Sequence, residues 1–247
     1  MFKDYLMFEW LKLKRQKIWM LVLAVPLISV ILGFSSFLGN YEVLMDKKDD
    51  NGWLEAWTQI TLFYGMLFLP ISSGIYAALV CRTDHLSGGW KLQFSLPLSK
   101  TMIYLSKLTV ILLLIFLMQL FLVLFYIVGG FIIHIENPIP VTFIVFAILL
   151  SWLGTFSLSA IQLWLSFKIK NFGIPLGINI FLSFLVFGAY TSKWGMLYPW
   201  AQPSFAISTP DESPIDSYPV FISAVVITFF IFVAMTSFRF KRADLES

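Results

Sequence analysis

The sequence contains little charge and almost no cysteine. Asp, Glu, Lys and Arg make up only 13% of its 247 residues, whereas 59% of the residues are hydrophobic. A soluble domain of this length needs a much larger share of polar surface, so this composition excludes an ordinary soluble protein. The single cysteine, Cys81, can form no intrachain disulfide and lacks the partners of a cysteine-based metal site.

Motifs for catalysis or nucleotide binding are also missing. The sequence has no Walker-type phosphate-binding loop and no H-E-x-x-H pattern. Its two histidines, His85 and His134, fall on opposite sides of the membrane in the topology given below, so they cannot share one site. We therefore expect no catalytic residue, no bound metal, no cofactor on this chain and no nucleic-acid partner.

Six long apolar runs dominate the chain. Each is close to or above the ~20 residues that an α-helix needs to cross the hydrocarbon core of a bilayer, and none carries Asp, Glu, Lys or Arg in its central stretch. We expect an all-α, polytopic membrane protein in which residues 1–247 form one transmembrane domain. The six expected spans are 18–38, 58–80, 103–131, 141–167, 172–190 and 218–238.

Charge is distributed unevenly between the two sides that these spans define. With the N-terminus placed in the cytoplasm, 14 of the 17 Lys and Arg residues fall on the inner side and nine of the 14 Asp and Glu residues fall on the outer side. The positive-inside rule then places both termini in the cytoplasm. The inner excess of positive charge suits anionic lipid head groups. The outer carboxylates either solvate their loops or attract a cationic ligand.

The N-terminal segment predicts a short helix that lies in the inner membrane interface. Residues 1–17 mix basic with aromatic residues, and Phe2, Leu6, Trp10 and Leu13 share one helical face. The alternative is an ordinary basic flank that only fixes the orientation of the first span.

The longest inner loop is expected at 81–102, where Gly88, Gly89 and Pro97 interrupt a polar stretch. The other inner loop, 168–171, has only four residues and leaves little room for a partner. A cytoplasmic protein would therefore dock on the longer loop or on the N-terminal segment.

Aromatic residues gather in the outer loops, where a belt of Trp and Tyr is expected at the membrane interface. Trp53 and Trp57 fall in the first of these loops. The last loop predicts a short re-entrant or interfacial helical element within 191–207, whose aromatic residues should lie at head-group level. These residues are Trp194, Tyr198, Trp200 and Phe205.

Polar residues follow one face of the fourth expected span. At 100° per residue they cover an arc of ~80°, and small hydroxyl residues on such a face let helices approach closely and form hydrogen bonds. The fifth span opens with a G-x-x-x-G pattern at 173–177. This polar set either packs helices together or lines a protomer interface or substrate path. Its members are Ser151, Thr155, Ser159, Gln162 and Ser166 on the fourth span and Asn179 and Ser183 on the fifth.

The spans lack the acids and histidines that proton- or sodium-coupled carriers place near the membrane midplane. They also lack the filter sequence or charged ring that is typical of channels. A membrane body of this kind that moves a solute must take its energy from elsewhere. We expect the 81–102 loop to bind a separate nucleotide hydrolase on the cytoplasmic side.

Residues 84–108 resemble the segment after the second span in permeases of the ABC-2 exporter class, and are most similar to permease subunits of lantibiotic immunity and bacitracin-type export systems. The start of such permeases also resembles Trp10–Arg15. Asp84 stands where the family often has Glu. Its side chain is one methylene group shorter, so its carboxylate reaches less far toward a partner. The residues that carry the resemblance are Asp84, Gly88-Gly89, Trp90-Lys91, Ser95-Leu96-Pro97, Lys100 and Tyr104–Lys107.

This resemblance implies a type V exporter fold, in which two permease subunits, identical or homologous, are each joined to a cytoplasmic ABC ATPase that holds ATP and Mg. It implies a coupling helix within 83–96 and short outer helices within 191–207. It also implies that a cationic antimicrobial peptide is expelled for self-immunity from the plasma membrane of a Gram-positive bacterium. The residues implied to couple to the ATPase are Asp84, His85, Leu86, Gly88, Trp90, Lys91 and Phe94.

Two alternatives remain open. The same fold could carry another cargo, such as a drug, a lipid-linked molecule, a polysaccharide or an ion. The protein could also bind or sense the peptide without transporting it, in which case it would need no ATPase.

Overall fold

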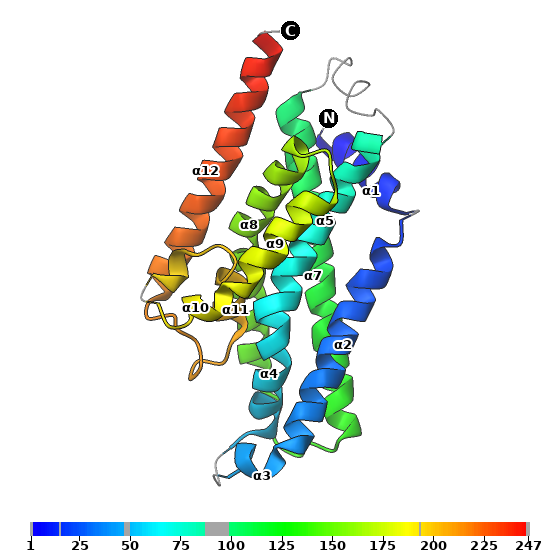
Figure 1. Cartoon of the computed structure of the whole chain (residues 1–247). Helices are drawn as coiled ribbons and strands as arrows, with labels where there is room; N and C mark the ends of the chain where they lie inside the picture. The colour runs from blue at the N-terminus through cyan, green and yellow to red at the C-terminus, as the bar shows by residue number, and fades with distance from the viewer. Residues whose placement is uncertain (1, 15, 47–49, 87–98, 193, 246–247) are drawn as a thin grey trace.

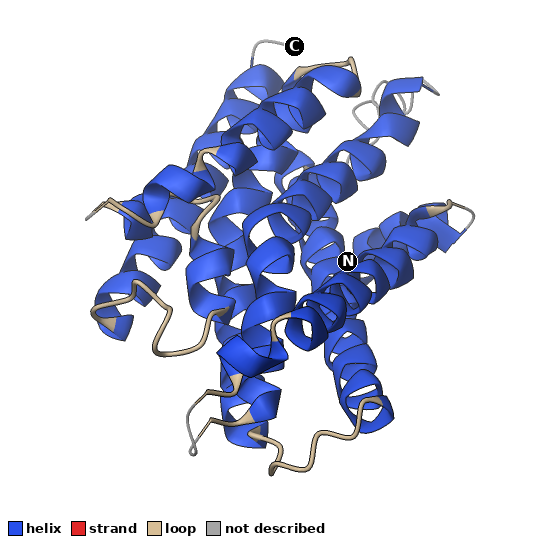
Figure 2. Cartoon of the chain, turned by 60° about the horizontal axis from the view of Figure 1, so that its bottom comes forward, coloured by secondary structure: helices blue, strands red, loops and turns tan. Residues whose placement is uncertain are grey.

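The computed structural model describes residues 2–14, 16–46, 50–86, 99–192 and 194–245. In this part of the chain the residues form helices joined by turns and loops, and no strand is present (Figures 1 and 2). The expected all-α, polytopic architecture is confirmed. Both termini lie at the same end of the bundle, where α5 and α8 finish and α7 begins (Figure 1). We call this the basic end, because it carries Arg82, Lys100, Lys107, Lys168 and Lys170.

Within the described residues, five helices are long and apolar enough to cross a membrane. Each contains one predicted span and extends it by one or more residues. The short helices α1 (Phe2–Lys14) and α3 (Tyr41–Leu44) flank the first of them. The five are α2 (Ile18–Gly39), the continuous helix α4–η1–α5 (Gly52–Phe63, Tyr64–Phe68 and Leu69–Leu86), α7 (Lys100–Ile132), α8 (Val141–Lys168) and α12 (Tyr218–Leu245).

The second of these helices runs for 35 residues from Gly52 to Leu86. The Asn51 side chain caps its start by accepting a hydrogen bond from the Trp53 backbone N–H at 2.9 Å. Pro70 follows the π-helical turn η1. Proline has no N–H to donate and its ring crowds the carbonyl one turn earlier, so the wider turn accommodates it without ending the helix.

The predicted inner loop 81–102 is shorter in the structure, because α5 continues through Leu86 and α7 begins at Lys100. Asp84 and His85 therefore lie in the last turn of a helix. Both side chains find partners on neighbouring helices rather than in solvent, which explains why the helix extends past the apolar run.

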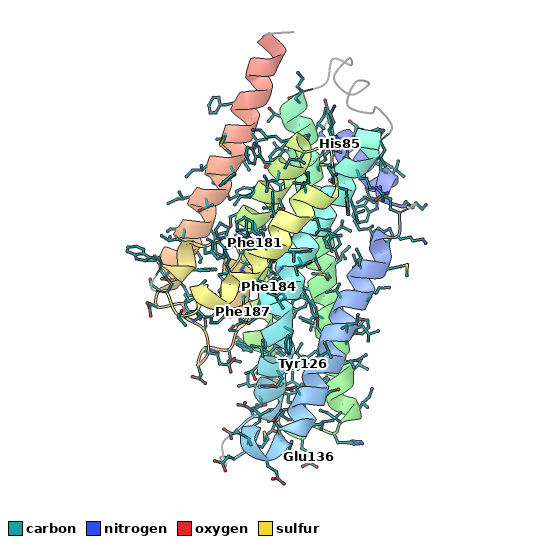
Figure 3. All side chains as sticks on the ribbon, in the orientation of Figure 1. His85, Tyr126, Glu136, Phe181, Phe184 and Phe187 are labelled. Atoms are coloured by element: carbon teal, nitrogen blue, oxygen red, sulfur yellow. The ribbon has the colours of Figure 1, made fainter. Side chains whose placement is uncertain are left out.

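The fifth predicted span, 172–190, is broken and shorter than expected. α9 (Gly173–Phe184) stops at a turn, and α10 (Val186–Ala189) follows it. With the turn residue between them, they cover 17 residues, which is fewer than the ~20 that cross the hydrocarbon core. Three exposed phenylalanines, Phe181, Phe184 and Phe187, lie on these helices (Figure 3), beside the exposed Ile174 and Leu185.

The chain after α10 folds back against the bundle. It forms a 3₁₀ turn, Gly195–Leu197, and then α11 (Gln202–Ile207), whose residues are all buried. Figure 1 shows α10 and α11 beside the lower half of the bundle and above α3. α11 packs on α8 at Gly154, where an added Cβ would lie 3.0 Å from the Gln202 carbonyl carbon. Irregular backbone at membrane depth is tolerated only where protein surrounds it in this way.

Trp53 and Trp57, predicted to belong to an aromatic belt at the membrane interface, are fully buried within the protein. Their indoles find acceptors inside the protein: Trp53 Nε1 donates to the Asn137 carbonyl and Trp57 Nε1 to the Ile207 carbonyl, both at 2.9 Å. Tyr126 joins the same cluster from α7, donating its hydroxyl to the Trp53 carbonyl at 2.6 Å (Figure 3).

The later aromatic residues divide into two pairs. Trp194 is 75% exposed and Tyr198 is half-buried, which fits an interfacial position. Trp200 and Phe205 are 6% and 1% exposed, so their side chains pack inside the protein. The reason is the fold-back of this segment, which lets Trp200 Nε1 donate to Asn179 Oδ1 at 2.8 Å inside the bundle.

Close backbone contacts hold the long helices together. Gly33 of α2 lies against α4, where an added Cβ would be 2.5 Å from the Ile60 Cα atom. Lipid tails are as apolar as core side chains, so tight packing rather than the hydrophobic effect drives such contacts within a bilayer.

Candidate functional site

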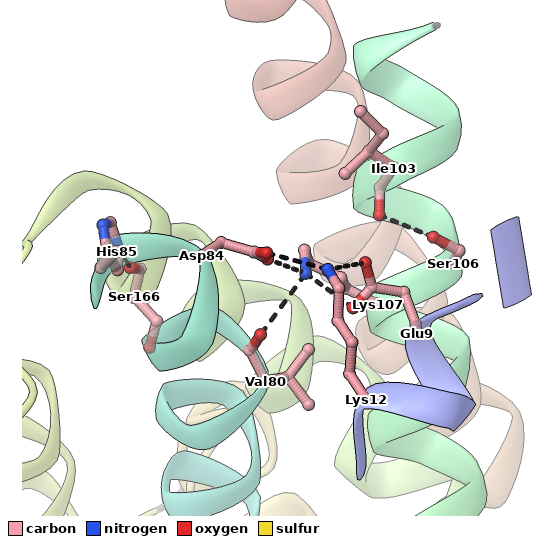
Figure 4. A network of polar contacts seen from close by, with 9 residues as sticks. All are labelled: Glu9, Lys12, Val80, Asp84, His85, Ile103, Ser106, Lys107 and Ser166. Atoms are coloured by element: carbon pink, nitrogen blue, oxygen red, sulfur yellow. Dashed lines mark hydrogen bonds and ion pairs between the residues drawn. The ribbon is translucent and has the colours of Figure 1, made fainter. Parts of the chain in front are cut away.

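Four charged side chains form a closed cluster inside the basic end (Figure 4). Lys107 Nζ lies 2.5 Å from Asp84 Oδ2 and 2.7 Å from Glu9 Oε2. Lys12 Nζ lies 2.8 Å from Asp84 Oδ1 and 3.0 Å from Glu9 Oε1. Each lysine thus bridges both carboxylates. We call these four residues the charged quartet.

Three helices supply the charged quartet. Glu9 and Lys12 lie one turn apart on α1, so they share a face. Asp84 comes from the last turn of α5, and Lys107 from the third turn of α7. The two helices that flank residues 87–98 are thereby tied to each other and to the N-terminal helix.

The charged quartet is electrically neutral and almost completely buried. The Lys107 side chain is 0% exposed, Asp84 2%, Glu9 4% and Lys12 15%. Taking each ion out of water costs several kcal/mol, and mutual attraction offsets this cost only when every charge is paired. Lys107 also donates to the Val80 carbonyl at 3.4 Å. Loss of any one member leaves a buried net charge.

The central stretches of the expected spans contain no charged residue. The basic end, in contrast, contains buried acids and lysines. The helices carry these charges near their ends, where the interface is close and the cost of burial is lower than at the midplane.

The predicted coupling residues occupy different environments. Asp84 points inward and is held by the two lysines of the charged quartet, so in this conformation it does not face a partner protein. His85 Nε2 donates to the Ser166 carbonyl at 2.8 Å and ties α5 to the end of α8. Leu86 is 75% exposed. The other predicted coupling residues lie outside the described residues, namely Gly88, Trp90, Lys91 and Phe94.

Sequence reasoning missed Glu9, Lys12 and Lys107 as site residues. The bonded partners on different helices lie 23 to 98 residues apart, so no local pattern reveals the pairing. Two signals were nevertheless present. Lys107 lies inside the apolar part of a helix, and a Glu-x-x-Lys pair occurs in a segment that otherwise reads as amphipathic.

α1 turns its charged quartet residues inward and apolar residues outward. Glu9 and Leu13 are buried, whereas Met7, Phe8 and Leu11 are 60%, 53% and 53% exposed. Exposed apolar residues beside a membrane contact lipid, so this arrangement favours an interfacial helix over a plain basic flank.

The polar stripe on α8 is buried within the chain. Ser159 Oγ lies 3.0 Å from Ser73 Oγ of α5, and Gln119 Nε2 of α7 donates to Ser151 Oγ at 2.9 Å. These contacts support helix packing as the role of Ser151 and Ser159. The buried members are Ser151, Thr155, Ser159, Gln162 and Ser166.

Two members of this stripe, Ser166 and Gln162, have side-chain polar atoms with no hydrogen-bond partner among the described residues. Gln162 has two such atoms. It is 0% exposed, yet neither its amide nitrogen nor its amide oxygen has a hydrogen-bond partner among the described residues. A buried polar group left unpaired costs about 1–3 kcal/mol. Packing therefore does not explain this amide, and it is the stripe residue best placed to meet a cargo molecule or a second subunit.

Asn179 connects α9 with α5 and the folded-back segment. Its Nδ2 donates to the Pro70 carbonyl at 2.9 Å, while its Oδ1 accepts the hydrogen bond from Trp200. These contacts also support a packing role. The G-x-x-x-G pattern differs, because a Cβ on Gly177 would meet nothing within 4 Å.

Comparison with known proteins assigns the chain to a family. Residues 5–186 match the model described as "ABC-2 family transporter protein". The match begins in α1, ends just after α9 and includes the whole charged quartet. No curated protein and no solved structure matches the chain. Membership of this family implies an ATPase partner. The chain therefore belongs to the ABC-2 transporter family and is a membrane-spanning permease subunit of an ABC transporter.

Proposed function

We propose that this permease subunit works in an ATP-driven exporter whose basic end faces the cytoplasm. The ATP, with Mg²⁺, is held by a separate ATPase subunit. The positive-inside rule supports this orientation. The charged quartet is the observation that carries the proposal, because it joins α1 to both helices that flank residues 87–98.

The segment 87–98 is the proposed contact with the ATPase. It follows Leu86, the last residue of α5, and precedes Ser99, which comes directly before α7. When ATP binding displaces this segment, α5 and α7 move with it because they are its direct neighbours in the chain. The charged quartet then transmits the movement to α1. Because the helix from Gly52 to Leu86 is continuous, the movement extends to the opposite end of the bundle. A second permease subunit, identical or homologous, completes the transport path.

A transport assay tests this coupling. We expect Trp90→Ala/Phe94→Ala to retain ATP hydrolysis but lose export when the full chain and its companion ATPase are reconstituted in vesicles. The matched control is Trp194→Ala/Leu197→Ala, which removes two exposed apolar side chains that belong to the folded-back segment after α10. Unchanged export by the first variant contradicts the proposal, as does solute pumping by the isolated chain without nucleotide.

For the cargo we propose a cationic, amphipathic antimicrobial peptide of the lantibiotic type, removed from the plasma membrane of a Gram-positive bacterium. Exposed carboxylates on the loops away from the basic end support a cationic ligand. A bundle interior with few charged groups suits a peptide taken from the membrane rather than through an aqueous channel. The carboxylates are Glu42, Asp46, Glu136, Asp211, Glu212 and Asp216.

Survival of a peptide-sensitive host tests the cargo. Cells that express the chain with its ATPase should tolerate more lantibiotic than cells that express the chain with an ATPase unable to hydrolyse ATP. Equal survival, with the assembled complex present in the membrane, would remove the peptide as cargo and leave the exporter function standing.

A further inference from the structure

A small cavity opens at the basic end between the last turn of α5 and the turn that joins α8 to α9. Its volume is about 280 Å³. Arg82 and Lys170 contribute positive charge, and no carboxylate is among the described residues that line it. The neighbouring Asp84 points away into the charged quartet, so it does not neutralise this cavity. We call it the Arg82 cavity.

Three further features of the Arg82 cavity suit an anion. Ser166 is 2% exposed and lines the cavity, and its hydroxyl has no hydrogen-bond partner among the described residues. The Arg82 guanidinium stands over the Phe172 ring, 5.7 Å from its centroid, which limits its orientations. α9 begins at the cavity wall, and the N-terminal end of a helix favours negative charge.

A second cavity, with a mostly apolar wall, adjoins the Arg82 cavity. It has a volume of about 630 Å³ and lies between α2 and α5. Arg82 and Leu86 line both cavities. Most other residues of its wall are apolar, and Lys17 adds a third positive charge. An anion with attached acyl chains fits both cavities together, whereas a free phosphate uses only the first.

The depth of the Arg82 cavity also points to a lipid. Arg82 lies in the last turns of a membrane-crossing helix, and Lys170 follows the end of another by two residues. Basic residues at this level meet lipid phosphates, and each contributes about 1 kcal/mol of attraction near an anionic surface.

We propose that the Arg82 cavity binds the phosphate of an anionic phospholipid from the leaflet at the basic end. Arg82 and Lys170 hold the phosphate, and Ser166 donates the hydrogen bond that its hydroxyl otherwise lacks. The acyl chains lie along the apolar cavity between α2 and α5. This site is independent of the cargo and of the direction of transport.

Lipid binding by the full chain tests the site. The chain is purified in detergent and titrated with phosphatidylglycerol against a phosphatidylcholine background, with bound lipid counted by native mass spectrometry. Loss of two contacts at about 1 kcal/mol each predicts that Arg82→Gln/Lys170→Gln weakens phosphatidylglycerol binding roughly 30-fold. The matched control, Lys3→Gln/Lys168→Gln, removes two exposed charges outside the Arg82 cavity and should leave binding within about threefold.

Ser166→Ala keeps the test informative even if the double variant folds poorly. The hydroxyl bonds no other described residue, so the thermal stability of the lipid-free chain should not fall, while phosphatidylglycerol binding should weaken about tenfold. Equal losses in the Arg82/Lys170 and control variants overturn the site in favour of diffuse attraction. Displacement of the lipid by millimolar inorganic phosphate overturns lipid as the ligand. If Arg82→Gln/Lys170→Gln still binds the lipid but no longer co-purifies with the ATPase, the lipid site is overturned and the surface is one that docks a protein.

Discussion

Replacement of Lys107 by methionine tests the charged quartet most directly. Methionine fills a similar volume but removes the positive charge that bridges Glu9 and Asp84. Lys12 then faces two buried carboxylates alone, so the cluster carries a net charge of −1. Breaking a buried ion pair by removing one partner costs about 3–5 kcal/mol. For a chain of this size that cost lowers the unfolding temperature by roughly 6–20 °C.

The measurement is thermal unfolding of the detergent-purified full chain, followed by intrinsic tryptophan fluorescence. Lys14→Met is the matched control, because it removes an exposed lysine from α1 and should shift the unfolding temperature little. The double variant Lys107→Met/Glu9→Gln restores neutrality and should recover at least part of the lost stability. A drop no larger than that of Lys14→Met, or a double variant less stable than Lys107→Met alone, would refute the electrostatic reasoning.

Three further predictions concern packing. Gly33→Ala should destabilise the chain by about 1–3 kcal/mol, because the new methyl group forces α2 away from the Ile60 backbone; an unchanged unfolding temperature would show that the helices are farther apart. Trp200→Phe should cost about 1–3 kcal/mol by leaving the Asn179 amide oxygen buried without its donor, which urea unfolding would measure. Gln162→Met should leave stability equal or higher, since the amide has no hydrogen-bond partner in the part of the chain that the structure describes. If that variant is stable but inactive in export, a role for Gln162 in packing alone is excluded.

The long helices were predictable because hydropathy over ~20 residues is a strong, local signal. Five of the six expected spans are found inside helices long enough to cross a membrane. The fifth was overestimated because apolar composition does not show where a chain turns back. Asn179, which bonds both Pro70 and Trp200, is one of the residues that hold the folded-back segment against the bundle.

The candidate site was predictable only in part. The resemblance drew attention to Asp84 and to Lys107, but the partners of these residues depend on how α1 packs against α5 and α7. Trp53 and Trp57 illustrate the same limit at the other end. An aromatic residue near a membrane boundary reads as interfacial, and only the tertiary contacts reveal that its indole has an acceptor inside the protein.

The separation of Glu9 from Lys107 by 98 residues also bears on biogenesis. The N-terminal helix leaves the ribosome long before the third long helix exists, so until then Glu9 has Lys12 of the same helix as a partner but lacks Lys107. Only a nascent chain whose third crossing has entered in the correct orientation can close the charged quartet. We therefore expect the contact to favour the correct topology, because a chain that inserts wrongly leaves Glu9 and Asp84 without the charge of Lys107.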